Sequence, residues 1–410
     1  MSLPPLAPEQ LVKPRRFEFR MALVFATLFV PVGIHAPYFP LWLEEVGFGP
    51  EKIAIILSAP MFLRVVTTPF ITMFADKARD RATVYIGMVA ASLLISLGYF
   101  LPPTYGVVLL VSLAFAVVLT PQSPLADSLA LSGVRRYGVD YPKLRIWGSA
   151  SFLVANFVGG MVIASSEAAS VPVMISASLC VTLLVAFLAP RLGRPRRASP
   201  LSAGEITQAA PSLFQLHFLL LLAGAGIVNA SHGYMFAFLS IYLKSLGIDA
   251  ATVGMLWAWA VVAEVLMFLV FARVFGKIGS ATVIALAAVF AIIRWCLTPL
   301  VWEAGLGVPG FFAVQSLHAF STGLFLIGVQ KLIAETVSEE QTGAAQGIAF
   351  FANGLAFATT TLVSGPLYDA FGANGFFAMA GVAFVGLILV GLAWRQPQRS
   401  GSGGDTRDPE

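Results

Sequence analysis

Charged residues are scarce in this sequence. Only 11% of its 410 residues are Asp, Glu, Lys or Arg, whereas soluble domains carry about a quarter. Hydrophobic residues make up 58% of the chain, and its mean hydropathy is +0.85. A chain of this composition lacks the polar residues that cover a water-soluble fold. The sequence therefore predicts an integral membrane protein, with the lipid bilayer as a partner.

Cysteine is nearly absent as well. The two cysteines, Cys180 and Cys296, both lie in apolar runs, which excludes a disulfide framework and favours small packing residues. The sequence also lacks a phosphate-binding loop, a His/Cys cluster at metal-ligand spacing and a nucleophile elbow. We therefore expect no enzyme activity, no metal and no cofactor.

Two further absences concern nucleic-acid binding and targeting. The pI is near 9.1, but no basic stripe with interleaved aromatics accompanies it, so we expect no nucleic-acid partner. No cleavable signal peptide is evident. The apolar stretch after the basic N-terminus runs from Met21 to about Leu43 and is too long for a signal h-region. It is predicted to be the first membrane span.

Long apolar runs take the place of the missing charge. A helical span needs about 20 apolar residues, and about twelve runs meet that length. They lie near residues 18–43, 52–74, 83–103, 107–131, 144–165, 171–190, 214–243, 252–274, 281–301, 308–334, 342–366 and 373–394. Backbone groups inside a bilayer must be paired within the protein, so we expect an all-α fold of twelve transmembrane helices.

The runs form two sets on either side of a polar stretch. We expect a cytoplasmic tail at residues 1–17, six-helix bundles at 18–190 and 213–395, a cytoplasmic linker at 191–212 and a disordered tail at 396–410.

Basic residues are distributed unevenly between the two sides of the predicted bundle. Loops on one side contain Lys77, Arg79, Arg81, Arg135, Arg136, Lys143, Arg191, Arg194, Arg196, Arg197, Arg273 and Lys277. Loops on the other side contain only Lys52 and Lys244. This asymmetry predicts a multi-pass protein of the plasma (inner) membrane with both termini in the cytoplasm.

An internal repeat supports the division into two bundles. Gly33, Trp42, Leu43, Gly47 and Lys77 match Gly233, Tyr242, Leu243, Gly247 and Lys277, each pair 200 residues apart. The same register pairs Arg64 with Glu264. Two parallel halves related by an axis along the membrane normal are the arrangement of major facilitator transporters.

A few ionisable residues interrupt the apolar runs. They are His35, Arg64, Asp127, Arg145, Glu264, Arg294 and His318. A charge at the bilayer centre costs at least ~2.5–3.5 kcal/mol, so such residues are expected to face the bundle interior and to pair.

Structural alternatives to these functional roles stay open. Glu264 could be a static partner of Arg294, Arg64 could snorkel to an interface, and the histidines could be hydrogen-bonded core residues. Loop-proximal solvation could explain Asp127 and Arg145.

The segment FADKARDR, residues 74–81, resembles the major facilitator loop motif, in which an aspartate precedes a basic cluster. Asp76, Lys77 and Arg81 stand at matching positions, although the glycines of the pattern are absent. The resemblance implies that these three residues take part in the conformational change.

Three other segments carry a more specific resemblance. They are PYFPLWL on the first span, LRIWGSASF on the fifth and LHAFSTGLFLIGVQKLI on the tenth. Together with Asp127, eighteen residues before Arg145, they resemble the lactose-permease-like oligosaccharide:proton symporters. They are still more similar to the phenylpropionate-permease-like branch. The resemblance extends from about residue 20 to residue 395.

The resemblance implies roles for the intramembrane residues. Asp127, Arg145 and Phe152 would bind substrate, and Glu264, Arg294 and His318 would couple transport to protons. In lactose permease the proton-carrying carboxylate follows the histidine by three residues, and here that place is Ser321. A serine does not titrate in the useful range. Glu264 is then the candidate carrier, and movement of Arg294 could control its charge.

Arg64 and His35 are additional candidates for substrate binding. Arg64 gives the membrane region three arginines against two acids, and arginine captures carboxylates through paired hydrogen bonds. Aromatic residues are frequent in the spans and include Phe39, Phe62, Phe152, Trp257 and Trp259. We therefore favour a monomeric, proton-coupled importer of a small aromatic or other organic carboxylate that works by alternating access. Oligosaccharide or nucleoside symport and drug or metabolite export are the alternatives.

Overall fold

The protein is helical throughout the described ranges, residues 12–193, 215–336 and 342–395 of a computed structural model. The N-terminal half contains α2 (Phe17–Glu45), α3 (Pro50–Lys77), α4 (Arg81–Ser96), α5 (Tyr105–Leu119), α6 (Gln122–Tyr137), α7 (Tyr141–Ser166) and α8 (Val171–Ala186). The C-terminal half contains α9 (Leu216–Ala230), α10 (Gly233–Ser245), α11 (Ala250–Val274), α12 (Ser280–Glu303), α13 (Gly307–Ser316), α14 (Leu324–Thr336), α15 (Thr342–Phe371) and α16 (Gly375–Trp394). Shorter turns are η1 (Leu97–Phe100), η2 (Ala168–Ser170), the π-helical η3 (Ala319–Gly323) and η5 (Gly372–Asn374). The expected linker at 191–212 and the expected tails lie largely outside the described residues.

Eleven segments in the described ranges are long and apolar enough to cross a membrane. The last, Ala345–Trp394, has 50 residues, whereas about 20 suffice for one crossing. It contains two helices, α15 and α16, separated at Gly372, which has a φ of +52°. Both helices pack against α9, so the segment folds back on itself. The all-α membrane fold is confirmed, and this segment contains two helices that are each long enough for one pass.

Three spans are interrupted helices rather than the continuous ones that the sequence predicts. The span from Tyr105 breaks at Thr120 and Pro121, because proline cannot donate a backbone hydrogen bond. The span from Leu216 breaks at Ser231 and His232. The span from Gly307 passes through η3, and π-helical turns are frequent at functional sites.

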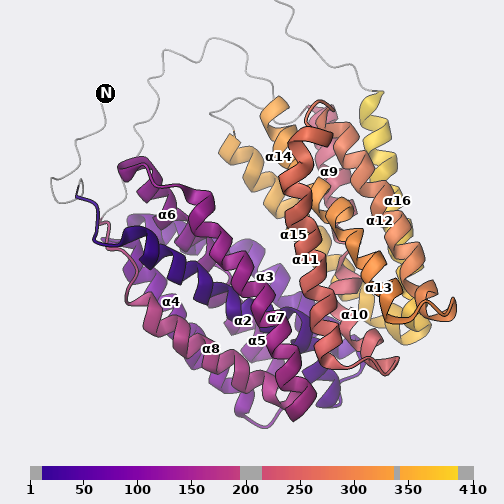
Figure 1. Cartoon of the computed structure of the whole chain (residues 1–410), viewed down its shortest axis with the longest axis horizontal. Helices are drawn as coiled ribbons and strands as arrows, with labels where there is room; N and C mark the ends of the chain where they lie inside the picture. The colour runs from indigo at the N-terminus through magenta and orange to yellow at the C-terminus, as the bar shows by residue number, and fades with distance from the viewer. Residues whose placement is uncertain (1–11, 194–214, 337–341, 396–410) are drawn as a thin grey trace, which may run out of the picture.

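The two halves meet at one end of the molecule and diverge at the other (Figure 1). Helix α3 packs along α15, α7 along α11, and α2 against α10. We call the end with the α2–α3 and α10–α11 turns the closed end. The end with residues 193 and 215 is the open end. One large apolar cluster joins both halves toward the closed end, whereas each half has its own smaller cluster elsewhere.

Glycine allows the helices of the two halves to approach closely at the closed end. A Cβ on Gly160 of α7 would lie 2.5 Å from the carbonyl oxygen of Ala250 on α11. A Cβ on Gly365 of α15 would lie 2.7 Å from the Cβ of Ala54 on α3. The ion pair Lys244–Glu44 also joins the halves here, with 3.7 Å between Nζ and Oε2.

Asp249 fixes the start of α11 beside this seam. Its carboxylate accepts hydrogen bonds from the backbone N–H and the hydroxyl of Thr252, at 3.0 and 2.7 Å. These bonds lower the pKa of Asp249 below its ordinary value. The carboxylate therefore stays charged at a helix N-terminus, where negative charge is stabilising.

Candidate substrate cavity and coupling cluster

A cavity of about 310 Å³ lies in the N-terminal half and is lined mainly by α2, α3, α5 and α6. His35 of α2 and Arg64 of α3 are its polar landmarks, and Phe29 and Phe115 supply aromatic walls. Phe236 of α10 is the lining residue that comes from the C-terminal half. The structure thus brings together two of the predicted substrate-binding residues in one compartment.

Arg64 has no ion-pair or hydrogen-bond partner among the described residues, although it is partly buried. The lining of its cavity includes no aspartate or glutamate. A guanidinium has five donors and no acceptor, so it needs oxygen atoms from elsewhere. Snorkelling to an interface does not describe this residue, because its side chain lines an internal cavity.

The ring of His35 packs among aromatic rings. It stacks on Phe39 with 4.3 Å between centroids, and Phe115 lies 6.2 Å away. The described residues give His35 no hydrogen-bond partner, so it is not the hydrogen-bonded core histidine that was one alternative. Its imidazole nitrogens are available to a molecule in the cavity.

Asp127 and Arg145 form a second group, nearer the open end. Their carboxylate and Nε atoms are 4.0 Å apart, and the hydroxyl of Tyr141 donates to Asp127 at 2.8 Å. The Arg145 guanidinium lies 4.2 Å from the ring centroid of Phe29, which also lines the cavity. Tyr141 was missed by the sequence reasoning, although it lies four residues before Arg145 on the same helix face.

Phe152 is placed differently from the expected substrate-stacking residue. It does not line the cavity. Its backbone packs instead against Gly33 of α2, where an added Cβ would lie 2.8 Å from the Phe152 carbonyl oxygen. In this conformation the residue contributes to the contact between α2 and α7.

The third group surrounds Arg294 in the C-terminal half. Arg294 is fully buried, with 0% of its surface exposed. It donates to His318 Nδ1 at 2.9 Å, to Gln315 Oε1 at 2.5 Å and to Ser321 Oγ at 3.3 Å. On the far side of the imidazole, His318 Nε2 lies 3.2 Å from Glu264 Oε2. The sequence suggested Glu264 beside Arg294, but His318 stands between them.

These contacts define the proton position on His318. Arginine only donates, so Nδ1 must accept from Arg294 and carries no proton itself. The proton of the neutral ring is then on Nε2, from which it is donated to Glu264. A second proton cannot enter at Nδ1 while Arg294 occupies that side. The position of Arg294 therefore limits protonation of His318 at Nδ1.

His232 completes the group and was missed by the sequence reasoning. Its Nδ1 faces the backbone carbonyls of Val228 and Asn229, at 3.3 and 3.2 Å, so this nitrogen is the donor. Its Nε2 then accepts from the hydroxyls of Ser321 and Thr322, at 3.2 and 3.1 Å. The signal in the sequence was a histidine inside an apolar run, one residue before the repeated glycine at 233. Gln315, three residues before His318, was also missed.

The loop motif is only partly described. The side chains of Asp76 and Lys77 lie outside the described residues. Arg81 begins α4 and donates to the hydroxyl of Ser132 on α6 at 3.4 Å. The Asp80 carboxylate accepts from the N–H of Ala82 at 3.2 Å and caps the helix.

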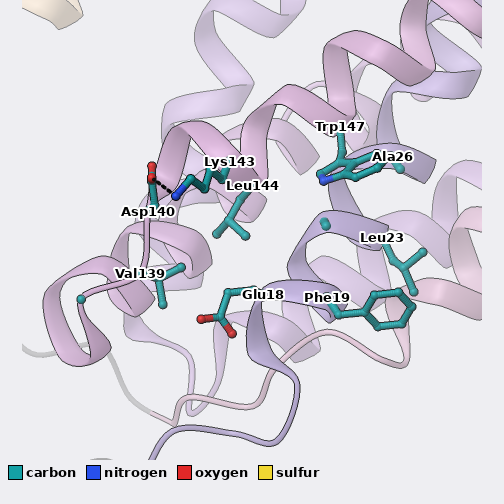
Figure 2. Close-up of a pocket in the computed structure, with 11 residues that line it drawn as sticks. Glu18, Phe19, Leu23, Ala26, Val139, Asp140, Lys143, Leu144 and Trp147 are labelled. Carbon is teal, nitrogen blue, oxygen red and sulfur yellow. Dashed lines mark ion pairs between the residues drawn. The ribbon is translucent and has the colours of Figure 1, made fainter.

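A further hollow of about 540 Å³ lies between α2 and the start of α7 at the open end (Figure 2). Its wall includes Phe19 and Trp147, and its rim carries the ion pair Asp140–Lys143 with a separation of 3.1 Å. None of the predicted site residues lines this hollow.

Two bundles of membrane-crossing helices are the arrangement of major facilitator transporters. The model of the MFS_1 like family matches residues 19–379, and the chain belongs to this family. The family resemblance expected from the sequence is confirmed.

Named relatives agree with this class. The probable 3-phenylpropionic acid transporter of Escherichia coli (strain K12) is 25% identical over 370 residues, which cover 90% of this chain and 96% of that protein. The maltose permease of Geobacillus stearothermophilus is 24% identical over 385 residues, which cover 91% and 94%. The crystal structure of the nucleoside transporter NupG has the same fold, with a TM-score of 0.77 at 16% identity, covering 93% of this chain and 100% of that one. These relatives are transporters, not enzymes.

Proposed function

We propose that the protein is a proton-coupled symporter that imports a small aromatic carboxylate by alternating access. The observation that carries the substrate class is Arg64. Its guanidinium lines an aromatic cavity that has no acid in its lining, and no described residue pairs with it. A substrate carboxylate would supply the missing acceptors through charge-assisted hydrogen bonds.

The size of the cavity also favours a small solute. Its volume of about 310 Å³ is at the lower end of the range for ligand pockets. A monocyclic acid suits such a space better than a disaccharide. The relative named as a 3-phenylpropionic acid transporter supports this class. The maltose permease and the nucleoside transporter support sugar or nucleoside transport as the second candidate. Drug or metabolite export is the third.

Proton coupling is proposed for the group of Glu264, His318 and Arg294. The Glu264 carboxylate is largely buried and hydrogen-bonded to a neutral imidazole, whose other nitrogen accepts from Arg294. Displacement of Arg294 would open Nδ1 of His318 to a proton, and the proton on Nε2 would then pass to the carboxylate of Glu264. Such an exchange requires no carboxylate at position 321.

The membrane orientation is likewise a proposal. Arg79 in a loop, Arg136 at the end of α6 and Lys143 at the start of α7 lie at the open end, whereas Lys244 pairs with Glu44 at the closed end. The positive-inside rule then places the open end in the cytoplasm, so the conformation is inward-facing in the plasma (inner) membrane. We propose that the monomer is the transporting unit.

Removal of the charge at position 264 tests proton coupling. In proteoliposomes, Glu264→Gln should abolish uphill uptake of 3-phenylpropionate driven by a pH gradient, because the carboxylate can no longer be loaded. Counterflow between equal substrate pools should persist, since it requires no net proton movement. The matched control is Glu303→Gln at the exposed end of α12, for which both activities should stay at the wild-type level. Uphill uptake that survives Glu264→Gln would rule out this residue as the proton carrier.

A further inference from the structure

The first turn of α10 lies between the cavity and the Arg294 group. Phe236 lines the cavity and is its lining residue from the C-terminal half. Its backbone N–H donates to the carbonyl of His232 at 3.0 Å, so the two residues belong to one turn. Any displacement of Phe236 by a bound molecule therefore acts on His232 within a single rigid helical turn.

Two side chains of this turn contact the coupling group. Met235, adjacent to Phe236, accepts from Arg294 through its sulfur, with 3.1 Å between Sδ and Nη2. His232 accepts from the hydroxyl of Ser321 at 3.2 Å, and Ser321 in turn accepts from Arg294. The same turn thus touches the cavity on one side and Arg294 on the other.

The turn follows a break between α9 and α10. Helix α9 ends at Ala230, whose carbonyl accepts from the hydroxyl of Thr360 on α15 at 2.6 Å. Gly233 then packs against α15, where a Cβ would lie 2.6 Å from the Thr360 hydroxyl oxygen. The break is therefore held by α15, while the side chains beyond it face the two sites.

We propose that the turn His232–Phe236 transmits occupancy of the cavity to the coupling group, with Phe236 touching the substrate and with Met235 and His232 as positioning residues for Arg294. A molecule beside Arg64 presses on Phe236, and the turn shifts Met235 and Ser321 relative to Arg294. Nδ1 of His318 then becomes open to a proton. This inference rests on the proposed function, because it takes the cavity as the substrate site and the Glu264 group as the proton site.

The contacts of this turn distinguish it from other residues that line the cavity. Phe236 also packs edge-to-face on Trp257 and Phe357, with centroids 6.4 and 5.9 Å away. His232 packs edge-on against Trp295 at 4.8 Å, and its charged or titratable neighbours are Arg294 and His318. Phe115 lines the same cavity but has no contact with the Arg294 group, which makes it a matched control.

Transport in proteoliposomes gives the first test, with 3-phenylpropionate, maltose and uridine as probes. For the probe that is transported, Phe236→Leu should lower the number of protons moved per substrate about tenfold, while counterflow changes far less. Phe115→Leu should weaken substrate affinity but leave the proton-to-substrate ratio at the wild-type value. A ratio that stays at the wild-type value in Phe236→Leu, or that falls equally in both variants, would overturn the proposal.

Nuclear magnetic resonance of the imidazole nitrogens gives a readout that does not require transport. The chain has four histidines, so single replacements assign the signals. A probe that shifts His35, in the cavity, should also shift His318 in the wild type and in Phe115→Leu, but not in Phe236→Leu. A His35 shift without a His318 shift in the wild type would overturn the transmission.

The same spectra distinguish a failure of the proposed function from a failure of the proposed transmission through the turn. If His318 responds to the probe but the wild type moves no protons, the proposed function fails and the transmission stands. If none of the three probes shifts His35, the cavity is not the binding site, and both the substrate assignment and the transmission route are wrong.

Discussion

Arg64 and Arg294 are both arginines at membrane depth, yet their surroundings differ in a way that separates their roles. Arg294 is fully buried and donates to an imidazole, an amide oxygen and a hydroxyl. Arg64 lines a cavity and has no partner in the described ranges. A cation whose donors are occupied serves the internal network, whereas one with free donors suits an incoming anion.

Replacement of Arg64 tests this distinction. For 3-phenylpropionate, Arg64→Ala should weaken binding about 10- to 100-fold, because a hydrogen bond to a charged group contributes about 1.5–3 kcal/mol. Arg64→Lys should retain part of the affinity, since it keeps the charge but loses the paired geometry. Titration calorimetry of the purified protein measures both. Equal affinity in Arg64→Ala and wild type would place the carboxylate elsewhere.

Residue types in apolar runs indicated most residues of the candidate site, but not how they pair. His35, Arg64, Glu264, Arg294 and His318 stand out in the sequence because each is costly in a bilayer. That His318 separates Glu264 from Arg294 depends on the π turn after it, which composition does not reveal. Phe236 could not be recognised, because aromatic residues are common in spans and only the packing shows which of them line a cavity.

At the scale of helices, close contacts through glycine set how the halves meet. Gly160 brings α7 against the backbone of α11, and Gly365 brings α15 against α3. A side chain at Gly160 would collide with backbone atoms, which cannot rotate away. The closed end therefore depends on the absence of a methyl group at that position.

A methyl group added at Gly160 should shift the equilibrium away from the conformation in which the two halves meet at the closed end. Gly160→Ala should disfavour closure by about 1–3 kcal/mol, the usual cost of overpacking. Spin labels at Ser165 and Glu303, exposed in either half near the closed end, should then report longer distances. Gly381→Ala is the control, because a Cβ at Gly381 meets nothing within 4 Å. An unchanged distance distribution in Gly160→Ala would show that the contact between Gly160 and α11 does not control closure.

The length of the apolar runs predicted the helices better than it predicted their interruptions. The predicted spans lie within a few residues of the observed helices, because about 20 apolar residues are both necessary and sufficient for a crossing. The break at Ser231 and His232 was not predicted, since neither residue is a helix breaker. It is stabilised by Thr360, which lies far away in the sequence and satisfies the freed carbonyl of Ala230.

At the scale of the whole molecule, the structure presents one of the two states that the proposed alternating access requires. The halves are joined at the closed end by tight helix contacts and by Lys244–Glu44, and they diverge at the open end (Figure 1). The cavity with Arg64 lies between these ends, and the Arg294 group lies across α10 from it. Rocking of the halves would close the open end around a bound molecule and disturb both sites together.

The most direct test of proton-coupled carboxylate transport is the pH outside de-energised vesicles that contain the protein. On addition of 3-phenylpropionate we expect external alkalinisation, because protons enter with the substrate, and no such signal in Glu264→Gln. Maltose and uridine should give none. Alkalinisation with maltose or uridine alone, or an equal signal in Glu264→Gln, would show that the protein is not a carboxylate symporter coupled through Glu264.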